Sequence, residues 1–123
     1  MANSDEIRLG TIILAEVSDP ATQQAVGPHF AVVLTRNAEI DAGVDLVVAV
    51  CTTSYSYPLK SGWFEMPSKP GGHELTGLSE ACVAKATWLE VVPQAKVLKT
   101  KGRAPVSITK QILNWLRDRK RQR

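Results

Sequence analysis

The sequence predicts a mainly β protein, a small antiparallel barrel or curled sheet of five to seven short strands that ends in one helix. Two apolar, valine-rich runs at 30–34 and 46–50 have the length of strands that are covered on both faces. Helical periodicity is confined to the last segment, where Ile108, Ile112 and Trp115 share one face. With 123 residues, of which 44% are hydrophobic, we expect a single domain spanning 1–123.

Turn residues divide the chain into its expected elements. Ser18-Asp19-Pro20 ends the first strand, and Ser107 is the expected N-cap of the helix. His73 lies in a glycine- and proline-rich loop, which we expect to be exposed to solvent. The expected strands are 10–17, 29–36, 45–53, 63–66, 78–85 with an extended continuation to 92, and 96–98; the expected loops are 21–28, 37–44, 54–62 and 67–77; residues 1–8 are expected to be loose and 117–123 to form a basic solvated end.

The candidate site lies between residues 29 and 53. His29 opens one predicted strand, while Thr52 and Thr53 close the next. If the two strands pair antiparallel, the start of one lies beside the end of the other, so the imidazole and the two hydroxyls meet at one rim of the sheet.

Composition excludes several classes of protein. No apolar run approaches the ~20 residues that cross a bilayer, and the polar start is no signal peptide, so we expect a cytoplasmic protein without a membrane partner. Cys51 and Cys82 each lie in an apolar run without a second ligand at metal spacing. We therefore expect both to be reduced core residues, with no metal site and no cofactor.

The net charge of +3 conceals an asymmetry along the chain. Residues 1–95 carry five Lys or Arg against eleven Asp or Glu, whereas residues 96–123 carry ten against Asp118 alone. Such a basic end suits nucleic acid, an acidic protein partner or the chain's own acidic body. A plain solvated tail is the alternative.

Three stretches resemble the MazF/PemK family of toxins, which share a fold with the gyrase poison CcdB. The stretch from Gly10 to Pro20 is similar to the family's opening Gly-Asp-Ile strand ending in Asp-Pro. Gly27-Pro28-His29-Phe30-Ala31-Val32-Val33-Leu34-Thr35 is similar to Gly-x-Arg-Pro-Ala-Val-Val-Leu-Ser, and Val47-Val48-Ala49-Val50-Cys51-Thr52-Thr53-Ser54 to a strand that ends in Thr-Thr or Thr-Ser.

The resemblance implies an SH3-like barrel, a homodimer, and metal-independent endoribonuclease activity on single-stranded RNA. It also implies neutralisation by a cognate antitoxin whose disordered acidic segment wraps the dimer. The chain departs from the family at its arginine, which stabilises the phosphate or acts as the acid and is replaced here by His29. Phe30 replaces the proline, and Gln23 and Gln24 fill the loop that often carries an acidic residue.

Cleavage of RNA without a metal needs a base for the 2′-hydroxyl, an acid for the departing 5′-oxygen and donors on the phosphate. An imidazole, with a reference pKa of ~6.5, can move a proton in either direction, so His29 is the candidate acid or base. Thr52 and Thr53 are candidate donors, and Lys85 is a candidate for charge neutralisation. A structural histidine bonded to a carbonyl, and threonines that merely end a strand, are the alternatives.

RNA binding is expected from the aromatic and basic residues that follow. Aromatic side chains stack on unpaired bases, and cations contact phosphates; they could instead pack the barrel edge or a dimer interface. The candidates are Tyr55, Tyr57, Lys60, Trp63, Arg117 and Arg119, whereas Trp88 and Trp115 are expected in the core.

Two functions follow from these residues. In the first, the protein is the toxin of a type II toxin–antitoxin system, and it cleaves single-stranded RNA to a 2′,3′-cyclic phosphate. In the second, it keeps the fold without the chemistry and binds a protein or nucleic acid, as a gyrase poison does.

Overall fold

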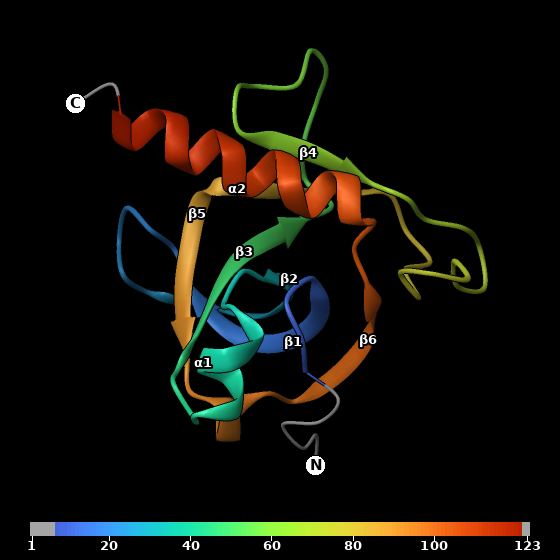
Figure 1. Ribbon diagram of the computed structural model, residues 1–123. Coiled ribbons are helices and arrows are strands. Elements are labelled where there is room, and N and C mark those ends of the chain that lie inside the picture. The colour runs from blue at the N-terminus through green and yellow to red at the C-terminus, as the bar shows by residue number, and fades with distance from the viewer. Residues whose placement is uncertain (1–6, 122–123) are drawn as a thin grey trace.

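Six antiparallel strands form one sheet that curls round on itself, with a long helix lying across it (Figure 1). The computed structural model describes residues 7–121. The strand order is β4-β5-β3-β2-β1-β6. The elements are β1 (Thr11–Ser18), β2 (Ala25–Val33), α1 (Asn37–Asp41), β3 (Leu46–Thr52), β4 (Trp63–Met66), β5 (Cys82–Val92), the 3₁₀ turn η1 (Gln94–Lys96), β6 (Lys99–Arg103) and α2 (Val106–Arg121).

The predicted mainly β fold with a C-terminal helix is confirmed, while its SH3-like character stays a prediction. Four element predictions were wrong. β2 begins four residues early because Ala25–Pro28 pairs with β1, and the connection at 37–44 contains α1. β5 begins at Cys82, and the last short strand is Lys99–Arg103 because η1 occupies the residues after Pro93.

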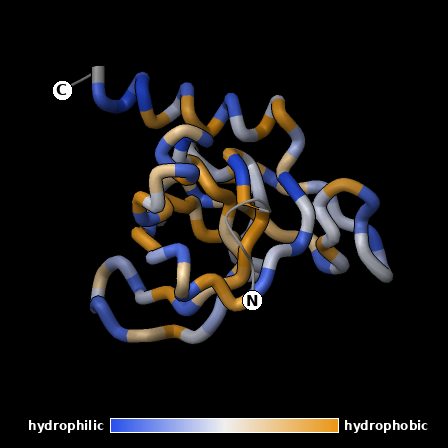
Figure 2. Tube along the Cα trace, turned by 60° about the horizontal axis from the view of Figure 1, so that its bottom comes forward, coloured by the Kyte–Doolittle hydropathy of each residue, from blue (hydrophilic) through white to orange (hydrophobic). Residues whose placement is uncertain are grey.

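Apolar side chains pack on both faces of the sheet because successive residues point in opposite directions. Val32 and Cys51 join Ile112 of α2 in one core cluster, whereas Val33 and Val48 join Ile40 of α1 in the other. Apolar and polar residues alternate along α2 (Figure 2), so this helix docks by one face and leaves the other in solvent.

A bulge bends β5 and lets it serve two partners. Ala49 of β3 pairs with Leu89, yet Cys51 pairs with Ala84, so four residues of β5 lie opposite Val50 alone. The start of β5 therefore pairs with β4, through Trp63↔Lys85 and Met66↔Cys82, before the strand turns along β3 (Figure 1).

The loop at 67–77 is more ordered than its glycines and prolines predict. Thr76 is fully buried and donates its hydroxyl hydrogen to the Pro67 carbonyl at 2.8 Å. His73 is half-buried, and its Nδ1 accepts hydrogen bonds from the backbone N–H groups of Leu75 and Thr76. The expectation of a solvated histidine was therefore wrong, and His73 holds the loop together.

The chain ends differ from their predictions in part. Residues 1–6, expected to be loose, lie outside the described residues, but Ile7 is only 1% exposed and Arg8 pairs with Asp41 at 2.7 Å. The helix α2 continues through Arg121, with exposed side chains from Arg117 to Lys120. No helix in the described range combines the length and apolar character needed to span a membrane.

Two glycines with the same backbone conformation test how tightly α2 is seated. Gly62 (φ +88°) and Gly43 (φ +81°) both lie in the left-handed region, but a Cβ at Gly62 would come 2.8 Å from Cζ2 of Trp115, whereas Gly43 has no neighbour within 4 Å. We expect Gly43→Ala to lower the free energy of unfolding by about 1 kcal/mol, from backbone strain alone. Gly62→Ala should cost about 1–3 kcal/mol more because of overpacking. Urea denaturation measures both, and equal losses would contradict this seating of Trp115.

Candidate functional site

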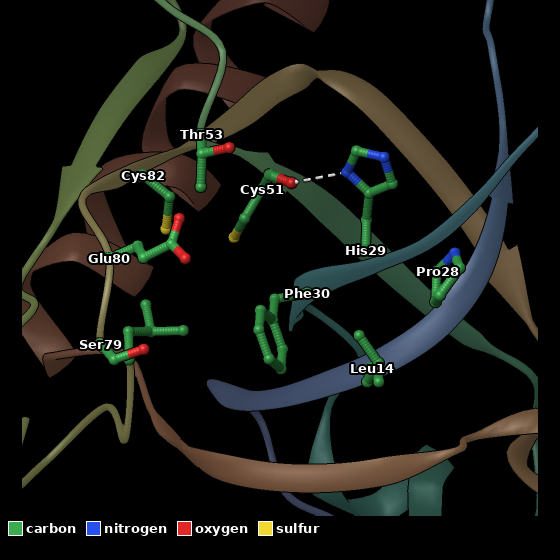
Figure 3. A pocket seen from close by; sticks show the side chains of 10 residues that line it. Leu14, Pro28, His29, Phe30, Cys51, Thr53, Ser79, Glu80 and Cys82 are labelled. Atoms are coloured by element: carbon green, nitrogen blue, oxygen red, sulfur yellow. Dashed lines mark hydrogen bonds between the residues drawn. The ribbon is translucent and has the colours of Figure 1, made fainter. Parts of the chain in front are cut away.

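A cavity of about 260 Å³ opens beside the middle of β2 and the end of β3 (Figure 3). Its walls combine apolar side chains with one imidazole, one carboxylate and two hydroxyls. The lining residues are Leu14, Pro28, His29, Phe30, Cys51, Thr53, Leu78, Ser79, Glu80 and Cys82.

His29 is held in place by the end of the neighbouring strand. Its Nδ1 lies 3.1 Å from the carbonyl oxygen of Cys51, and a carbonyl only accepts, so Nδ1 carries the hydrogen. In the neutral ring, Nε2 is then the basic nitrogen. The Trp88 ring lies 5.4 Å from the imidazole, and its Nε1 donates to the Ser18 carbonyl at 3.0 Å. His29 therefore meets the end of β3 as the antiparallel pairing predicts, although it lies in the middle of β2. Half-buried Trp88 packs against His29.

The two threonines at the end of β3 separate. Thr53 is exposed and lines the cavity with His29. Thr52 points to the opposite face of the sheet, is 9% exposed, and its Oγ1 accepts the Ser54 backbone N–H at 3.1 Å. By the same alternation, His29 lies on the face of Ala31 and Val48 together with Thr52, whereas Thr53 lies among the cavity residues on the face of Cys51.

The two cysteines form the apolar floor of the cavity. Both are free and buried, which confirms the prediction of reduced core residues. The hydrogen bond with Cys82, together with burial, raises the pKa of Cys51 well above its usual value, while the same contact lowers the pKa of Cys82. Across residues 7–121, no group of three or more His, Cys, Asp or Glu side chains could hold a metal ion.

A second cluster, which we call the aromatic face, covers the outer side of β4 and consists of Tyr55, Tyr57, Lys60, Trp63, Glu65 and Lys85. The ammonium groups of Lys85 and Lys60 lie 4.2 Å and 5.3 Å from the centroid of the Trp63 ring. Lys85 follows Ala84, which packs in the core beneath α2, so alternation turns Lys85 away from the cavity. Lys85 therefore lies on the aromatic face, over the Trp63 ring, and does not line the cavity.

Glu65 binds both tyrosines of the aromatic face. Its Oε2 accepts hydrogen bonds from the hydroxyls of Tyr55, at 3.2 Å, and of Tyr57. The Glu65 hydrogen bond raises the pKa of Tyr57 to about 12. The pKa of Tyr55 is also raised, first by burial and then by Glu65. An acidic side chain thus lies at the centre of a surface that sequence reasoning described as aromatic and basic.

The two arginines predicted to bind RNA lie on α2. The Arg119 guanidinium lies 4.9 Å from the centroid of Trp115, whose Nε1 donates to Ser61 Oγ at 2.9 Å. Trp115 thereby joins the helix to the loop that carries Lys60, and it is half-buried as well as packed on the core. Arg117 is exposed and donates to Asn114 Oδ1 at 2.8 Å.

Sequence reasoning missed Glu80, Ser79 and Glu65. The sequence predicted a strand from residue 78, whereas β5 begins at Cys82 and Glu80 lies just ahead of it. The sequence shows this acidic residue two positions before Cys82, but its place at the cavity depends on the pairing of β5 with the end of β3.

Comparison with known proteins agrees with the fold. The family described as "PemK-like, MazF-like toxin of type II toxin-antitoxin system" matches residues 8–118. No curated protein matches the sequence. Among solved structures, the chain is similar to an "Endoribonuclease in complex with its cognate antitoxin from Mycobacterial species", with a TM-score of 0.61 and 17% identity over 93% of this chain and 92% of that one. The structural likeness shows a shared fold, and the family match covers nearly all of the described residues. The chain therefore belongs to the PemK-like, MazF-like family of toxins of type II toxin–antitoxin systems.

Proposed function

We propose that this toxin is a metal-independent endoribonuclease that cleaves single-stranded RNA and leaves a 2′,3′-cyclic phosphate. The observation that carries the proposal is the imidazole of His29, held in one tautomer by the Cys51 carbonyl beside the threonines that end β3. Family membership supports the reaction class. Because the proposed substrate is RNA, we propose that the protein acts in the cytoplasm.

The catalytic residues divide into two groups in this proposal. His29 moves a proton through Nε2, and Thr53 donates a hydrogen bond to the scissile phosphate; such groups each contribute ~10²-fold or more to a rate. Thr52 positions the turn after β3 through its bond to the Ser54 N–H. Lys85, which lies on Trp63, neutralises charge along the RNA and not at the reacting phosphate.

RNA is proposed to extend from the cavity over the aromatic face. Tyr55 lies against Tyr57 at 6.0 Å between ring centroids, and 66% of Tyr57 is exposed, so its ring is accessible to an unpaired base. Base stacking contributes roughly 1–3 kcal/mol per base. Lys60 on this face, with Arg117 and Arg119 on α2, supplies cations for phosphates.

Two protein partners complete the proposal, a second copy of the chain and a cognate antitoxin. Val47 and Val91 pair across β3 and β5 and are 38% and 65% exposed. Val47 lines a groove of about 350 Å³ together with Leu34, Leu113 and Leu116. An exposed aliphatic surface of this kind favours a protein contact, and the basic end of α2 suits an acidic antitoxin segment.

A binding module without catalytic activity is the second candidate. The bond from His29 to the Cys51 carbonyl is also typical of a histidine that only stabilises the sheet. Both candidates share the fold, so activity and binding must be measured separately.

Two substitutions at His29 distinguish proton transfer from structural support. We expect purified wild type to cleave single-stranded RNA in the presence of EDTA with cyclic phosphate ends. His29→Ala and His29→Asn should both lower kcat by ~10²–10⁴-fold, because neither side chain exchanges a proton near neutral pH. Asn retains an N–H near the position of Nδ1, so it controls for the bond to Cys51. Activity in His29→Asn with loss in His29→Ala would contradict the catalytic role, and an inactive wild type that still binds RNA would favour the binding module.

Glu65→Gln tests the charge on the aromatic face. Because the Glu65 hydrogen bond raises the pKa of Tyr57 to about 12, the substitution should move the appearance of tyrosinate absorbance down toward the ordinary pH of ~10. Removing one negative charge should also tighten RNA binding by up to about fivefold at low salt. Glu74→Gln makes the same change of charge in the loop at 67–77. Equal effects from the two variants would show that the aromatic face does not contact RNA.

The arginines of α2 are tested by the salt dependence of RNA binding. If each contacts one phosphate, Arg117→Gln/Arg119→Gln should reduce the slope of log K against log salt by about 1.4. Lys96→Gln/Lys99→Gln is the control, since it removes the same amount of charge from η1 and from β6, the strand at the other edge of the sheet from β4. An unchanged slope in the arginine variant would mean that these side chains are only solvated.

A further inference from the structure

We propose that the aromatic face holds a binding subsite for one unpaired guanine of the RNA, and that the carboxylate of Glu65 recognises this base. The subsite rests on the proposed function, in which single-stranded RNA is the ligand of this surface. Glu65 thereby gives the toxin a preference for one base.

Strand β4 turns the aromatic face away from helix α2. Phe64 and Met66 pack in the core cluster that includes Ile112 of α2. Because successive residues of a strand point to opposite faces, Trp63 and Glu65 project on the other side of β4. Glu65 is exposed, so its carboxylate is open to a ligand from solvent.

One oxygen of the Glu65 carboxylate is occupied and the other is not. Oε2 accepts hydrogen bonds from the hydroxyls of both Tyr55 and Tyr57. Among the residues that the structure describes, no hydrogen bond or ion pair occupies Oε1. The two tyrosines fix the direction of the carboxylate, so Oε1 is an acceptor held in place before any ligand arrives. An ionised carboxylate only accepts hydrogen bonds, and its ligand must therefore supply donors.

Guanine is the base whose edge fits this acceptor. Proteins read unpaired RNA bases on the Watson–Crick edge, and there guanine presents two adjacent donors, the ring N1–H and the N2 amino group. Adenine and cytosine each present one amino group beside a ring nitrogen that is an acceptor. Uracil presents one N–H between two carbonyls. Each of these three bases therefore brings a lone pair toward the carboxylate, whereas guanine does not.

Tyr57 and Trp63 provide the other parts of a nucleotide site. The Tyr57 side chain is 66% exposed and its hydroxyl is bound to Glu65, so a base stacked on the ring brings its edge to the carboxylate. The ammonium groups of Lys85 and Lys60 lie 4.2 Å and 5.3 Å from the centroid of the Trp63 ring, where they are available to a phosphate. Trp63 and Glu65 lie two residues apart on β4, a separation of about 6.6 Å, which brings base and phosphate sites together.

The subsite lies on the face of the sheet that carries His29. Glu65 and Thr52 both lie opposite Val83 of β5, so these three side chains share a face. The imidazole of His29 lies on that face beside Thr52 and is bound to the Cys51 carbonyl. In the strand order, β2 is three strands from β4, which is ~14 Å at the usual strand spacing. An RNA strand lying across the sheet can therefore place a guanine at Glu65 and a phosphate at His29.

The test measures base preference without cleavage. Uridine heptamers with 2′-O-methyl groups throughout lack the nucleophile, so wild type binds them without cutting them, and fluorescence anisotropy gives the Kd. A heptamer with guanosine at its centre should bind at least about tenfold tighter than the heptamer of uridine alone, as expected for a contact with two donors. Inosine at the centre, which lacks the N2 amino group, should lose most of this gain.

Two variants with the same change of charge test the role of Glu65. Glu65→Gln should bind the guanosine heptamer more weakly and the uridine heptamer more tightly, because it loses the paired acceptor as well as one negative charge. The preference for guanosine should therefore disappear. Glu74→Gln removes one negative charge outside the aromatic face and should keep the preference.

The outcomes separate the subsite from the function on which it rests. If Glu65→Gln keeps the preference for guanosine, Glu65 does not read the base and the assignment is wrong. If wild type binds all central bases alike, or prefers adenosine or cytidine, the aromatic face holds no guanine subsite. Cleavage of unmodified RNA by wild type then decides the proposed function separately. A protein that selects guanosine through Glu65 without cutting RNA keeps the subsite, and only the endoribonuclease fails.

Discussion

The antiparallel pairing of β2 with β3 is the constraint on which the candidate site depends. Ala31 lies opposite Val50, and this register brings the middle of β2, at His29, beside the last residues of β3. The bond from His29 to the Cys51 carbonyl follows from it. A slip of one residue would turn every side chain of β2 to the other face. Because Ala31 and Val33 are fully buried, such a slip would also expose the core, so packing energy fixes the position of the imidazole.

The bend in β5 divides the functional residues between two surfaces. Ahead of the bulge, Cys82 lines the cavity, and at the start of the bulge Lys85 packs on Trp63. At the end of the bulge, Trp88 donates to the Ser18 carbonyl and lies against His29. One strand therefore contributes to the floor of the cavity, to the aromatic face and to the support of the imidazole. The apolar contacts beneath α2 hold this bend in place, since Ala84 and Ala86 both lie in that core.

Local patterns predicted the sheet better than the site. Strand β4 was predicted at its observed bounds, and the meeting of His29 with the end of β3 followed from hairpin geometry. Thr52 and Thr53 point to opposite faces of the sheet, as the alternation of side chains along a strand predicts. The position of Glu80 depends on a four-to-one bulge between β3 and β5. No property of either strand taken alone encodes that bulge, because it arises from curling the sheet beneath α2.

Replacing an arginine by His29 changes the chemistry of this rim without removing it. A guanidinium is charged at every physiological pH and cannot exchange its proton, so it stabilises a phosphate but transfers nothing. An imidazole is cationic only when protonated, and it can then deliver that proton. Because the cavity is lined by no other basic side chain, its positive charge depends on the protonation of one residue. The bond to Cys51 fixes the ring and leaves Nε2 as the nitrogen that is free of this contact. A structural and a catalytic role for His29 are therefore compatible, and proton transfer is the property that distinguishes them.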